Sequence, residues 1–392
     1  MHYLCIAIHE INMNPFINRA IRKQFLDRLL PNKVLVLLGA RRVGKTLFLK
    51  NIAGNDFSEP YLWMNGEDLV ARSQLAVRSV EHYRSLVGHH KILIIDEAQK
   101  VPYIGLILKL MVDHLEGLKI IATGSSVFDL SNKLGEPLTG RKYTFYLYPF
   151  AQMELTPYEN RIETRARLEE RLVYGTYPEL TGLQGLTAKA EYLFELVNAY
   201  LLKDILEFDG VRNSDKLVKL LRLIAYQTGK EVSLEELGRQ LGLSRNTVEK
   251  YLDLLSKVFV IYRISGFSRN LRSEISKSHR WYFYDNGIRN ALINNFNPLS
   301  IRNDMGELWE SYVLTERIKY QQYTGKHTNN YFWRTYQQQE IDWIEESSGR
   351  IEAYEVKWNP GKNSKPPSAW RTSYPESSFR MITPENYLEW VE

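Results

Sequence analysis

An eight-residue segment near the start of the chain, GARRVGKT at 39–46, constrains the fold more than any other feature of the sequence. It directly follows the apolar run VLVLL (34–38) and precedes the helical pattern LFLKNIA (47–53). Gly39 and Gly44 allow backbone N–H groups to curl around a polyphosphate at a helix N-terminus. The order of strand, glycine-rich loop and helix predicts a nucleotide-binding α/β core. The loop residues expected to contact the nucleotide are Gly39, Ala40, Arg41, Arg42, Val43, Gly44, Lys45 and Thr46.

Two acidic residues at the end of a later apolar run complement this loop. The run ILIIDE (92–97) places Asp96 and Glu97 at the end of a buried strand. Lys45 is expected to contact the β- and γ-phosphates of ATP, while Thr46 and Asp96 hold Mg²⁺. Glu97 then orients or activates the attacking water. Without a P-loop nearby, two such acids would more often cap a helix or face solvent; with one, they predict ATP hydrolysis with ATP and Mg²⁺ as cofactors.

Two further groups have interpretations that stay open. The run KIIATGSS (119–126) ends in hydroxyls, of which Ser125 is a candidate sensor of the γ-phosphate, although a serine there also suits a helix cap. The segment EPLTGR (136–141) presents Arg141 after a glycine turn. This arginine is either a finger that completes a neighbouring subunit's site or an ordinary surface residue. The finger interpretation implies a homo-oligomer.

These motifs together resemble a known family. The segments GARRVGKT, ILIIDEAQ, IIATGSS, EPLTGR and YLYPF (146–150) are similar to the AAA-type ATPase domain of the AAA_14/DUF4143 group of bacterial and archaeal proteins. Later segments, YGTYPE (174–179) and YLLKDI (200–205), resemble the same group, so the likeness covers most of the chain. It implies a P-loop ATPase followed by a winged helix and a C-terminal region with a nuclease-like fold.

The middle of the chain carries a helix-turn-helix pattern. Apolar residues recur at helical spacing in VSLEELGRQLGLSRNTVEKYLDLL (232–255), and the strand-like runs that follow suggest a wing. Duplex DNA binding is expected through Arg245, Asn246 and the wing arginines. The alternative is a winged helix used only for packing or assembly, since Glu249 and Asp253 make the second helix acidic. Six cations between 261 and 290 predict a local basic patch: Arg263, Arg269, Arg272, Lys277, Arg280 and Arg289.

Three acids and a lysine near the C-terminus resemble the PD-(D/E)xK endonuclease pattern. Asp342 lies in QEIDWI (339–344), and Glu355 and Lys357 share one face of the next predicted strand. A hairpin through 347–350 brings Asp342 beside them, and Glu310 arrives from a preceding helix. Glu310, Asp342 and Glu355 are candidate ligands for a second Mg²⁺ or a Mn²⁺ ion, and Lys357 for positioning or deprotonating water. Intact residues permit cleavage without establishing it, so a domain that only binds DNA is the alternative.

Composition bounds the location and partners. Lys and Arg exceed Asp and Glu by only 51 to 46, so any DNA affinity must come from a local patch. A single cysteine, Cys5, excludes an internal disulfide and fits a cytoplasmic location, and the apolar run at 3–8 is too short to span a membrane. Met1 and Met13 are equally good starts. Predicted partners are further copies of the chain, DNA and a protein, but no membrane.

The predicted fold class is α/β, with a P-loop parallel-sheet core, a helical lid, a winged-helix domain and a restriction-endonuclease-like α/β domain. The favoured function is an Mg²⁺-dependent ATPase that couples ATP hydrolysis to DNA binding or processing. The alternative is a nucleotide-dependent switch or scaffold that regulates a protein partner, with an inactive nuclease-like tail. The predicted domains are 13–160 (ATPase core), 161–210 (lid or connector), 211–290 (winged helix) and 304–392 (nuclease-like).

Overall fold

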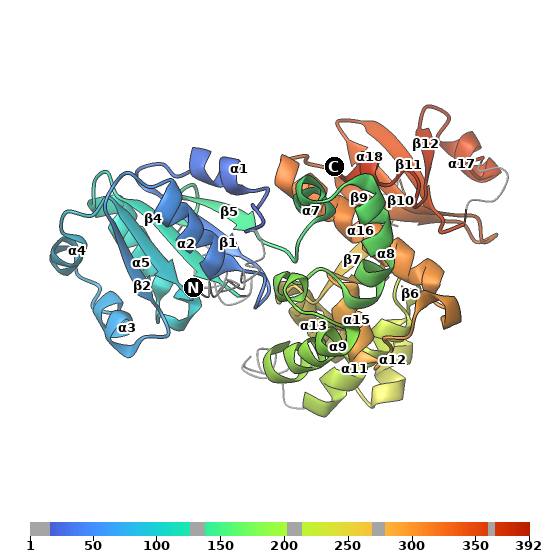
Figure 1. Cartoon of the computed structure of the whole chain (residues 1–392), viewed down its shortest axis with the longest axis horizontal. Coiled ribbons are helices and arrows are strands. Elements are labelled where there is room, and N and C mark those ends of the chain that lie inside the picture. The colour runs from blue at the N-terminus through green and yellow to red at the C-terminus, as the bar shows by residue number, and fades with distance from the viewer. Residues whose placement is uncertain (1–15, 126–137, 202–213, 269–278, 360–364) are drawn as a thin grey trace, which may run out of the picture.

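The chain contains two β-sheets, and a group of helices lies next to the second one (Figure 1). The computed structural model describes residues 16–125, 138–201, 214–268, 279–359 and 365–392. The predicted α/β class with a parallel-sheet core is confirmed. Both candidate start residues, Ser126 and residues 202–205 of the YLLKDI segment lie outside the described residues.

The first sheet has five parallel strands in the order β2-β3-β4-β1-β5. Because β1 lies between β4 and β5 and is covered on both faces, its apolar run is buried, as a continuous apolar run predicts. The carboxyl ends of the parallel strands meet at one edge of the sheet. The bounds are β1 Lys33–Leu38, β2 Tyr61–Asn65, β3 Ile92–Asp96, β4 Lys119–Gly124 and β5 Lys142–Tyr146. The helices here are α1 Arg22–Asp27, α2 Lys45–Asn55, α3 Leu69–Leu75, α4 Val80–Val87 and α5 Ile104–His114.

A second group of helices lies beside the second sheet, in the lower right of Figure 1. Helix α8 packs on α15, although more than a hundred residues separate them in the sequence. No helix in the described parts of the chain has the length and apolar character needed to cross a membrane. The bounds are α7 Gln152–Leu155, α8 Arg161–Tyr174, α9 Leu186–Glu195, a π-helical stretch Leu196–Leu201, α11 Ser214–Tyr226, α12 Leu234–Leu241, α13 Arg245–Lys257 and α15 Asn286–Leu292.

The second sheet has seven strands in the order β12-β11-β10-β9-β7-β8-β6. Strands β7 and β9 pair in parallel, which joins the hairpin of the predicted wing to the strands of the C-terminal region. The predicted winged-helix and nuclease-like segments therefore share one continuous sheet. The strands are β6 Glu231–Val232, β7 Ile261–Gly266, β8 His279–Phe283, β9 Asn329–Arg334, β10 Glu340–Ser347, β11 Arg350–Val356 and β12 Ser378–Ile382; the helices are α16 Met305–Thr324, α17 Ser368–Ser373 and α18 Leu388–Val391.

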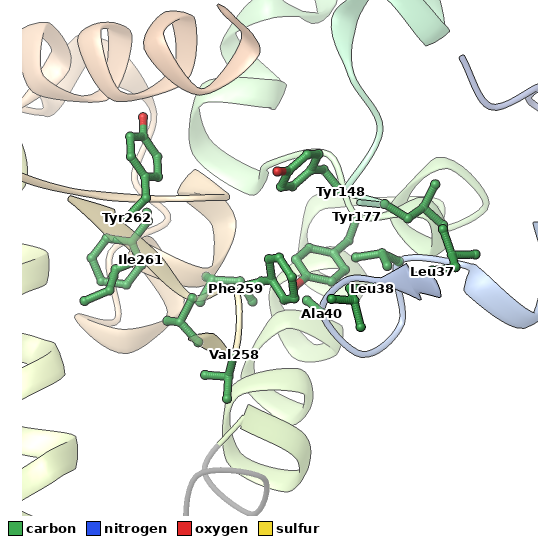
Figure 2. Packing of buried hydrophobic residues seen from close by; sticks show 14 of the residues in the cluster. Leu37, Leu38, Ala40, Tyr148, Tyr177, Val258, Phe259, Ile261 and Tyr262 are labelled. Carbon is green, nitrogen blue, oxygen red and sulfur yellow. The ribbon is translucent and has the colours of Figure 1, made fainter. Parts of the chain in front are cut away.

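A hydrophobic cluster runs without a break from the first sheet into the second half of the chain. Figure 2 shows part of it, where Leu38 and Ala40 belong to the same cluster as Phe259. The Phe259 ring lies 5.9 Å from the Tyr146 ring and 6.3 Å from that of Tyr148. Phe259 follows α13, so the turn that closes the helix-turn-helix packs beside the end of β1 and β5. The base of the P-loop is thus in apolar contact with the distal half of the molecule.

Candidate functional site

The P-loop backbone requires glycine at two positions for different reasons. Gly44 precedes α2 with φ at 92°, in the left-handed region that glycine adopts without a steric penalty. A Cβ atom on Gly39 would lie 2.1 Å from the carbonyl oxygen of Leu147. Residue 39 therefore packs directly against the backbone of Leu147, just after β5, and the loop then leads into α2. The first-turn N–H groups of such a helix lack intrahelical acceptors and suit an anion.

The structure brings the predicted phosphate and Mg²⁺ residues together. Lys45 is 5% exposed, and its ammonium donates to the carbonyl oxygens of Gly39 at 2.8 Å and Ala40 at 2.9 Å. The Thr46 hydroxyl donates to Asp96 Oδ2 at 2.8 Å. Thr46 lies in the first turn of α2, just after β1, and Asp96 ends β3, so this contact joins the ends of two strands at the carboxyl edge of the sheet. Both oxygen groups are of the kind that Mg²⁺ prefers.

A third strand end holds Asp96 from the other side. The hydroxyl of Thr123, in β4, donates to Asp96 Oδ1 at 2.5 Å and accepts from the Glu97 backbone N–H at 3.0 Å. Thr123 is fully buried. The sequence singled out the hydroxyls of this strand end for the γ-phosphate, whereas Thr123 instead fixes the orientation of the Asp96 carboxylate.

Glu97 and Ser125 are linked through Gln99. The Gln99 side-chain amide donates to Glu97 Oε2 at 2.5 Å and to Ser125 Oγ at 3.2 Å. Glu97 has φ at 51°, a conformation that costs energy for a residue with a side chain and that clusters at functional sites. The structure therefore brings the predicted water-orienting acid and the predicted sensor into one network. Gln99 lies in the ILIIDEAQ segment, but its residue type alone does not predict this bridging position.

Arg141 lies at the opposite end of the sheet from the P-loop. Its carbonyl oxygen accepts from Val34 N at 2.9 Å, at the beginning of β1, whereas the P-loop follows the end of that strand. Its guanidinium Nε donates to Asp113 Oδ1 at 2.7 Å, and its side chain is 39% exposed. A six-residue strand is about 20 Å long, so Arg141 does not reach the P-loop of its own chain.

The predicted hairpin places the tail residues on neighbouring strands. Trp343 of β10 pairs with Tyr354 of β11, and Asp342 Oδ2 accepts from Val356 N at 2.9 Å. The ammonium of Lys357 lies 2.7 Å from Glu355 Oε1 and 3.9 Å from Asp342 Oδ2. Lys357 was predicted within the strand, but β11 ends one residue earlier, at Val356.

Two residues of β8, Tyr282 and Arg280, were not predicted to belong to this cluster and complete it. The Tyr282 hydroxyl, from β8, donates to Glu310 Oε1 at 2.7 Å. Arg280, on the same face of β8, lies 3.9 Å from Asp342 Oδ1 and 2.9 Å from Glu340 Oε2, and stacks over the Phe332 ring at 4.4 Å. No motif marks Arg280 or Tyr282, because only the shared sheet carries β8 to the C-terminal carboxylates.

Burial and neighbouring charge raise the pKa values of these three carboxyl groups together. Burial raises the pKa of Glu310 to about 8, and the charge of Asp342 adds to the rise. Burial likewise raises the pKa of Glu355 to about 7, again with a contribution from Asp342. Burial also raises the pKa of Asp342 itself. Each carboxylate disfavours ionisation of its neighbours, an arrangement that a bound cation would relieve.

The carboxylates of this cluster are the type of ligand that divalent ions prefer, but their side chains are not grouped around a common metal position. Among the residues that the structure describes, no group of three or more Asp, Glu, His or Cys side chains is arranged to hold a metal. Lys357 and Arg280 lie against the carboxylates instead. The buried Oε2 atom of Glu355 has no hydrogen-bond partner, and carboxylate oxygens are the donors that Mg²⁺ and Mn²⁺ prefer. If an ion binds here, Asp342 and Glu355 offer the nearest pair of carboxylates.

The predicted basic patch is wrong for two of its members. Arg280 and Arg289 are each only 4% exposed and are paired with Glu340 and Asp304. Counting charges along the sequence could not show that β8 is an interior strand and that α15 is enclosed by helices. Arg263 is exposed. The other three members, Arg269, Arg272 and Lys277, lie outside the described residues.

The predicted recognition helix, α13, has an exposed N-terminal turn. Arg245 and Asn246 are exposed, and Arg245 Nε lies 3.2 Å from Glu235 Oε1. Glu249 and Asp253 line an open groove between α13 and the β7–β8 hairpin, together with Arg263 and other residues. The face that would meet a duplex therefore carries both signs of charge.

Three family models match the chain. They are an AAA domain over 31–156, a domain of unknown function named DUF8612 over 165–299, and another named DUF4143 over 305–385. The matches to the first and last confirm the resemblance to the AAA_14/DUF4143 group.

Similar proteins from archaea and bacteria carry no assigned role. The uncharacterized protein MJ1544 of Methanocaldococcus jannaschii is 26% identical over 316 residues, which cover 76% of this chain and 69% of that protein. The uncharacterized protein Rv2008c of Mycobacterium tuberculosis is 26% identical over 330 residues, covering 83% of this chain and 70% of that protein. The AMPPCP-bound DnaA structure from Aquifex aeolicus is 16% identical, with a TM-score of 0.28, and covers 60% of this chain and 85% of that one. A TM-score this low carries no functional weight.

Proposed function

Because the chain combines an AAA domain with a DUF4143 domain, we propose that it binds ATP with Mg²⁺ and couples ATP hydrolysis to the binding or processing of DNA. The hydrogen bond of 2.8 Å between Thr46 Oγ1 and Asp96 Oδ2 carries this proposal. It gathers two oxygen donors at the N-terminus of α2, where the β- and γ-phosphates of a nucleotide are favoured. Mg²⁺ bound there would neutralise charge on the phosphates.

The other residues of the network have roles that follow from their contacts. The ammonium of Lys45 lies inside the loop against two carbonyl oxygens, and it would contact the β- and γ-phosphates of a bound nucleotide. Glu97 accepts from Gln99 and is placed at the strand end to orient the attacking water. Gln99 is hydrogen-bonded to both Ser125 and Glu97, so loss of the γ-phosphate on hydrolysis would affect both residues through it.

Arg141 acts, in this proposal, on a neighbouring copy of the chain. Its position at the far end of β1 excludes a role in its own site, and its partial exposure leaves it accessible to a second subunit. A finger supplied by a neighbour stabilises negative charge in the transition state of phosphoryl transfer. The proposed active form is therefore a homo-oligomer.

DNA is the proposed partner of the second half. The exposed N-terminal turn of α13, with Arg245 and Asn246, is the part of a helix-turn-helix that meets base edges in the major groove. The acids Glu249 and Asp253 weaken general attraction to phosphates. DNA binding should therefore depend on a few contacts made by Arg245 and Asn246, and it should weaken as the salt concentration rises.

Metal-dependent phosphodiester hydrolysis is a second candidate function, favoured by the unpartnered buried Oε2 of Glu355 beside Asp342. Asp342 and Glu355 would hold the ion. Lys357, whose side chain is 46% exposed, would position the water that attacks phosphorus as the bond to the leaving oxygen breaks. Glu310 is held by Tyr282 at the edge of the same cluster.

ATP turnover with and without DNA tests the proposal. Wild-type protein and a Lys45→Ala control are assayed with Mg²⁺ alone and with duplex, single-stranded or branched DNA, at low and high salt. Turnover that DNA stimulates, that falls with salt and that Lys45→Ala abolishes supports it. Turnover indifferent to every nucleic acid, with salt-independent binding, favours the alternative of a nucleotide-dependent switch that acts on a protein partner.

A further inference from the structure

Arg19, just before α1, connects the P-loop to the distal half of the molecule. It is 5% exposed. Its Nη1 donates to the carbonyl oxygen of Val43 at 2.8 Å, and its Nε to Glu154 Oε1 at 2.9 Å. Its Nη2 donates to the Tyr148 carbonyl oxygen at 2.6 Å and to the Tyr323 hydroxyl at 3.2 Å. One buried guanidinium therefore joins the P-loop, the segment after β5 and helix α16.

The Val43 carbonyl belongs to the same peptide unit as the Gly44 N–H. Every described peptide bond is trans, so the two groups point in opposite directions. Gly44 precedes the first residue of α2, where N–H groups face a bound phosphate. By holding the carbonyl from behind, Arg19 turns the Gly44 N–H toward the phosphate side of the loop.

Tyr323 is the link between Arg19 and α16. Its hydroxyl accepts from Arg19 and from the Tyr148 backbone N–H at 3.1 Å. The same helix contacts the segment after β5 again, where Glu316 accepts from Gln152 N at 2.5 Å. Helix α16 also carries Glu310 of the carboxylate cluster near its other end. One helix thus runs from the Tyr323 contact with Arg19 to that cluster.

We propose that Arg19 positions the Val43–Gly44 peptide for nucleotide binding, and that Tyr323 makes nucleotide binding and the docking of α16 depend on each other. This inference rests on the proposed nucleotide function. A phosphate that accepts from Gly44 N–H polarises the peptide and strengthens Val43 as an acceptor for Arg19. Arg19 is then more firmly fixed, so its hydrogen bond to the Tyr323 hydroxyl stabilises the docked position of α16. Because coupling is reciprocal, a loosely docked α16 must weaken nucleotide binding by the same factor.

The test compares Tyr323→Phe with Tyr320→Phe, which removes a hydroxyl from the same helix about one turn away, at a ring stacked against Arg317. Binding of ADP with Mg²⁺ is measured by calorimetry, and hydrogen–deuterium exchange of 305–324 is followed with and without ADP. In the wild type, ADP should slow exchange in this helix. Tyr323→Phe should lose that effect and bind ADP about tenfold more weakly. Tyr320→Phe should match the wild type in both measurements.

Arg19→Lys adds a second variant that keeps the positive charge but lacks the fork of donors that reaches four acceptors. It should bind ADP more weakly even where its thermal unfolding without nucleotide matches the wild type. If Tyr323→Phe binds ADP as tightly as the wild type and shows the same exchange response, the inference is overturned while the nucleotide function stands. If wild-type protein binds no nucleotide, the proposed function itself is wrong.

Discussion

Thr46 and Asp96 meet through a hydrogen bond of 2.8 Å at the carboxyl edge of the first sheet. Asp96 is held on its other oxygen by Thr123 at 2.5 Å. One carboxylate therefore ties the loop after β1 to the ends of β3 and β4. Its orientation is fixed before any ligand arrives, and such preorganisation lowers the reorganisation needed in the transition state.

Glu97→Gln and Lys45→Ala should separate hydrolysis from binding. Gln in place of Glu97 can still accept from Gln99, so the loop and Asp96 keep their geometry. We expect Glu97→Gln to bind ATP normally and to lose turnover about 100-fold or more, because only the water-orienting carboxylate is gone. Lys45→Ala should lose binding as well. Steady-state turnover and equilibrium ATP binding measure the two effects, and a fully active Glu97→Gln protein would remove Glu97 from catalysis.

Mixing inactive chains tests the role of Arg141. If Arg141 completes a neighbour's site, Arg141→Ala and Glu97→Gln chains should each be inactive alone. Together they should recover part of the activity, at interfaces that carry neither change. Asp113→Asn is the control, because it breaks only the ion pair that Arg141 makes within its own chain. Mixed oligomers without any recovery, or a monomer with full turnover, would exclude the finger role.

The proximity of Thr46 and Asp96 could be predicted from the sequence, because strand order in a parallel sheet brings their positions together. Thr46 follows the end of β1, and Asp96 ends β3. In a parallel sheet these ends share one edge, so residue type and strand order were sufficient. The contact between Asp96 and Thr123 was missed, because a buried threonine hydroxyl gives no signal that distinguishes it from a strand residue chosen for shape.

The residues that sequence reasoning missed depend on contacts between distant segments. Arg19 belongs to no motif, and its partners Val43 and Tyr323 lie 24 and 304 residues away. Arg280 was predicted in a surface patch, but β8 pairs on both edges and carries the side chain inward to Glu340. Charge counting along a chain cannot tell an exposed arginine from one that burial forces into an ion pair.

Asp304 should stabilise the fold in a pH-dependent way. Although burial acts in the opposite direction, hydrogen bonds from Arg302 and Arg289 lower the pKa of Asp304 to about 2, from 3.8. Because the folded pKa lies below the unfolded one, this stabilisation is present above about pH 4 and is lost as the pH falls toward 2. The difference corresponds to at most about 2.4 kcal/mol, which solvent around this half-buried group reduces to about 1 kcal/mol.

Asp304→Asn should therefore lower the free energy of unfolding by about 1 kcal/mol at pH 7 in urea titrations. The gap from the wild type should narrow steadily as the pH is lowered from 5 to 3. Asp253→Asn is the control, because its pair with Lys257 is largely exposed and should change stability by less than about 0.5 kcal/mol. A gap that stays constant with pH would show that the loss comes from packing and not from charge.

The carboxylate cluster of the second sheet gives the last prediction. If Asp342 and Glu355 hold Mg²⁺ or Mn²⁺, then Asp342→Ala or Glu355→Ala should eliminate metal-dependent nicking of DNA. Lys357→Ala should reduce turnover more than metal binding, because its half-exposed ammonium acts on water or the scissile phosphate. ATP turnover should survive all three changes, since none of these residues contacts the first sheet's network.

Linear, circular, single-stranded and branched DNA are incubated with wild-type protein and metal, with and without ATP, and circular dichroism confirms that each variant is folded. Nicking that persists in Asp342→Ala would point to a contaminating nuclease, because that variant lacks a carboxylate required to hold the ion. A wild type that cleaves none of these substrates, yet binds DNA more weakly when the half-exposed Lys357 is replaced by Ala, would instead make the cluster part of a DNA-binding surface. The raised pKa values of Glu310 and Glu355 would then be a consequence of burial and of the neighbouring Asp342 charge, with no metal-binding role.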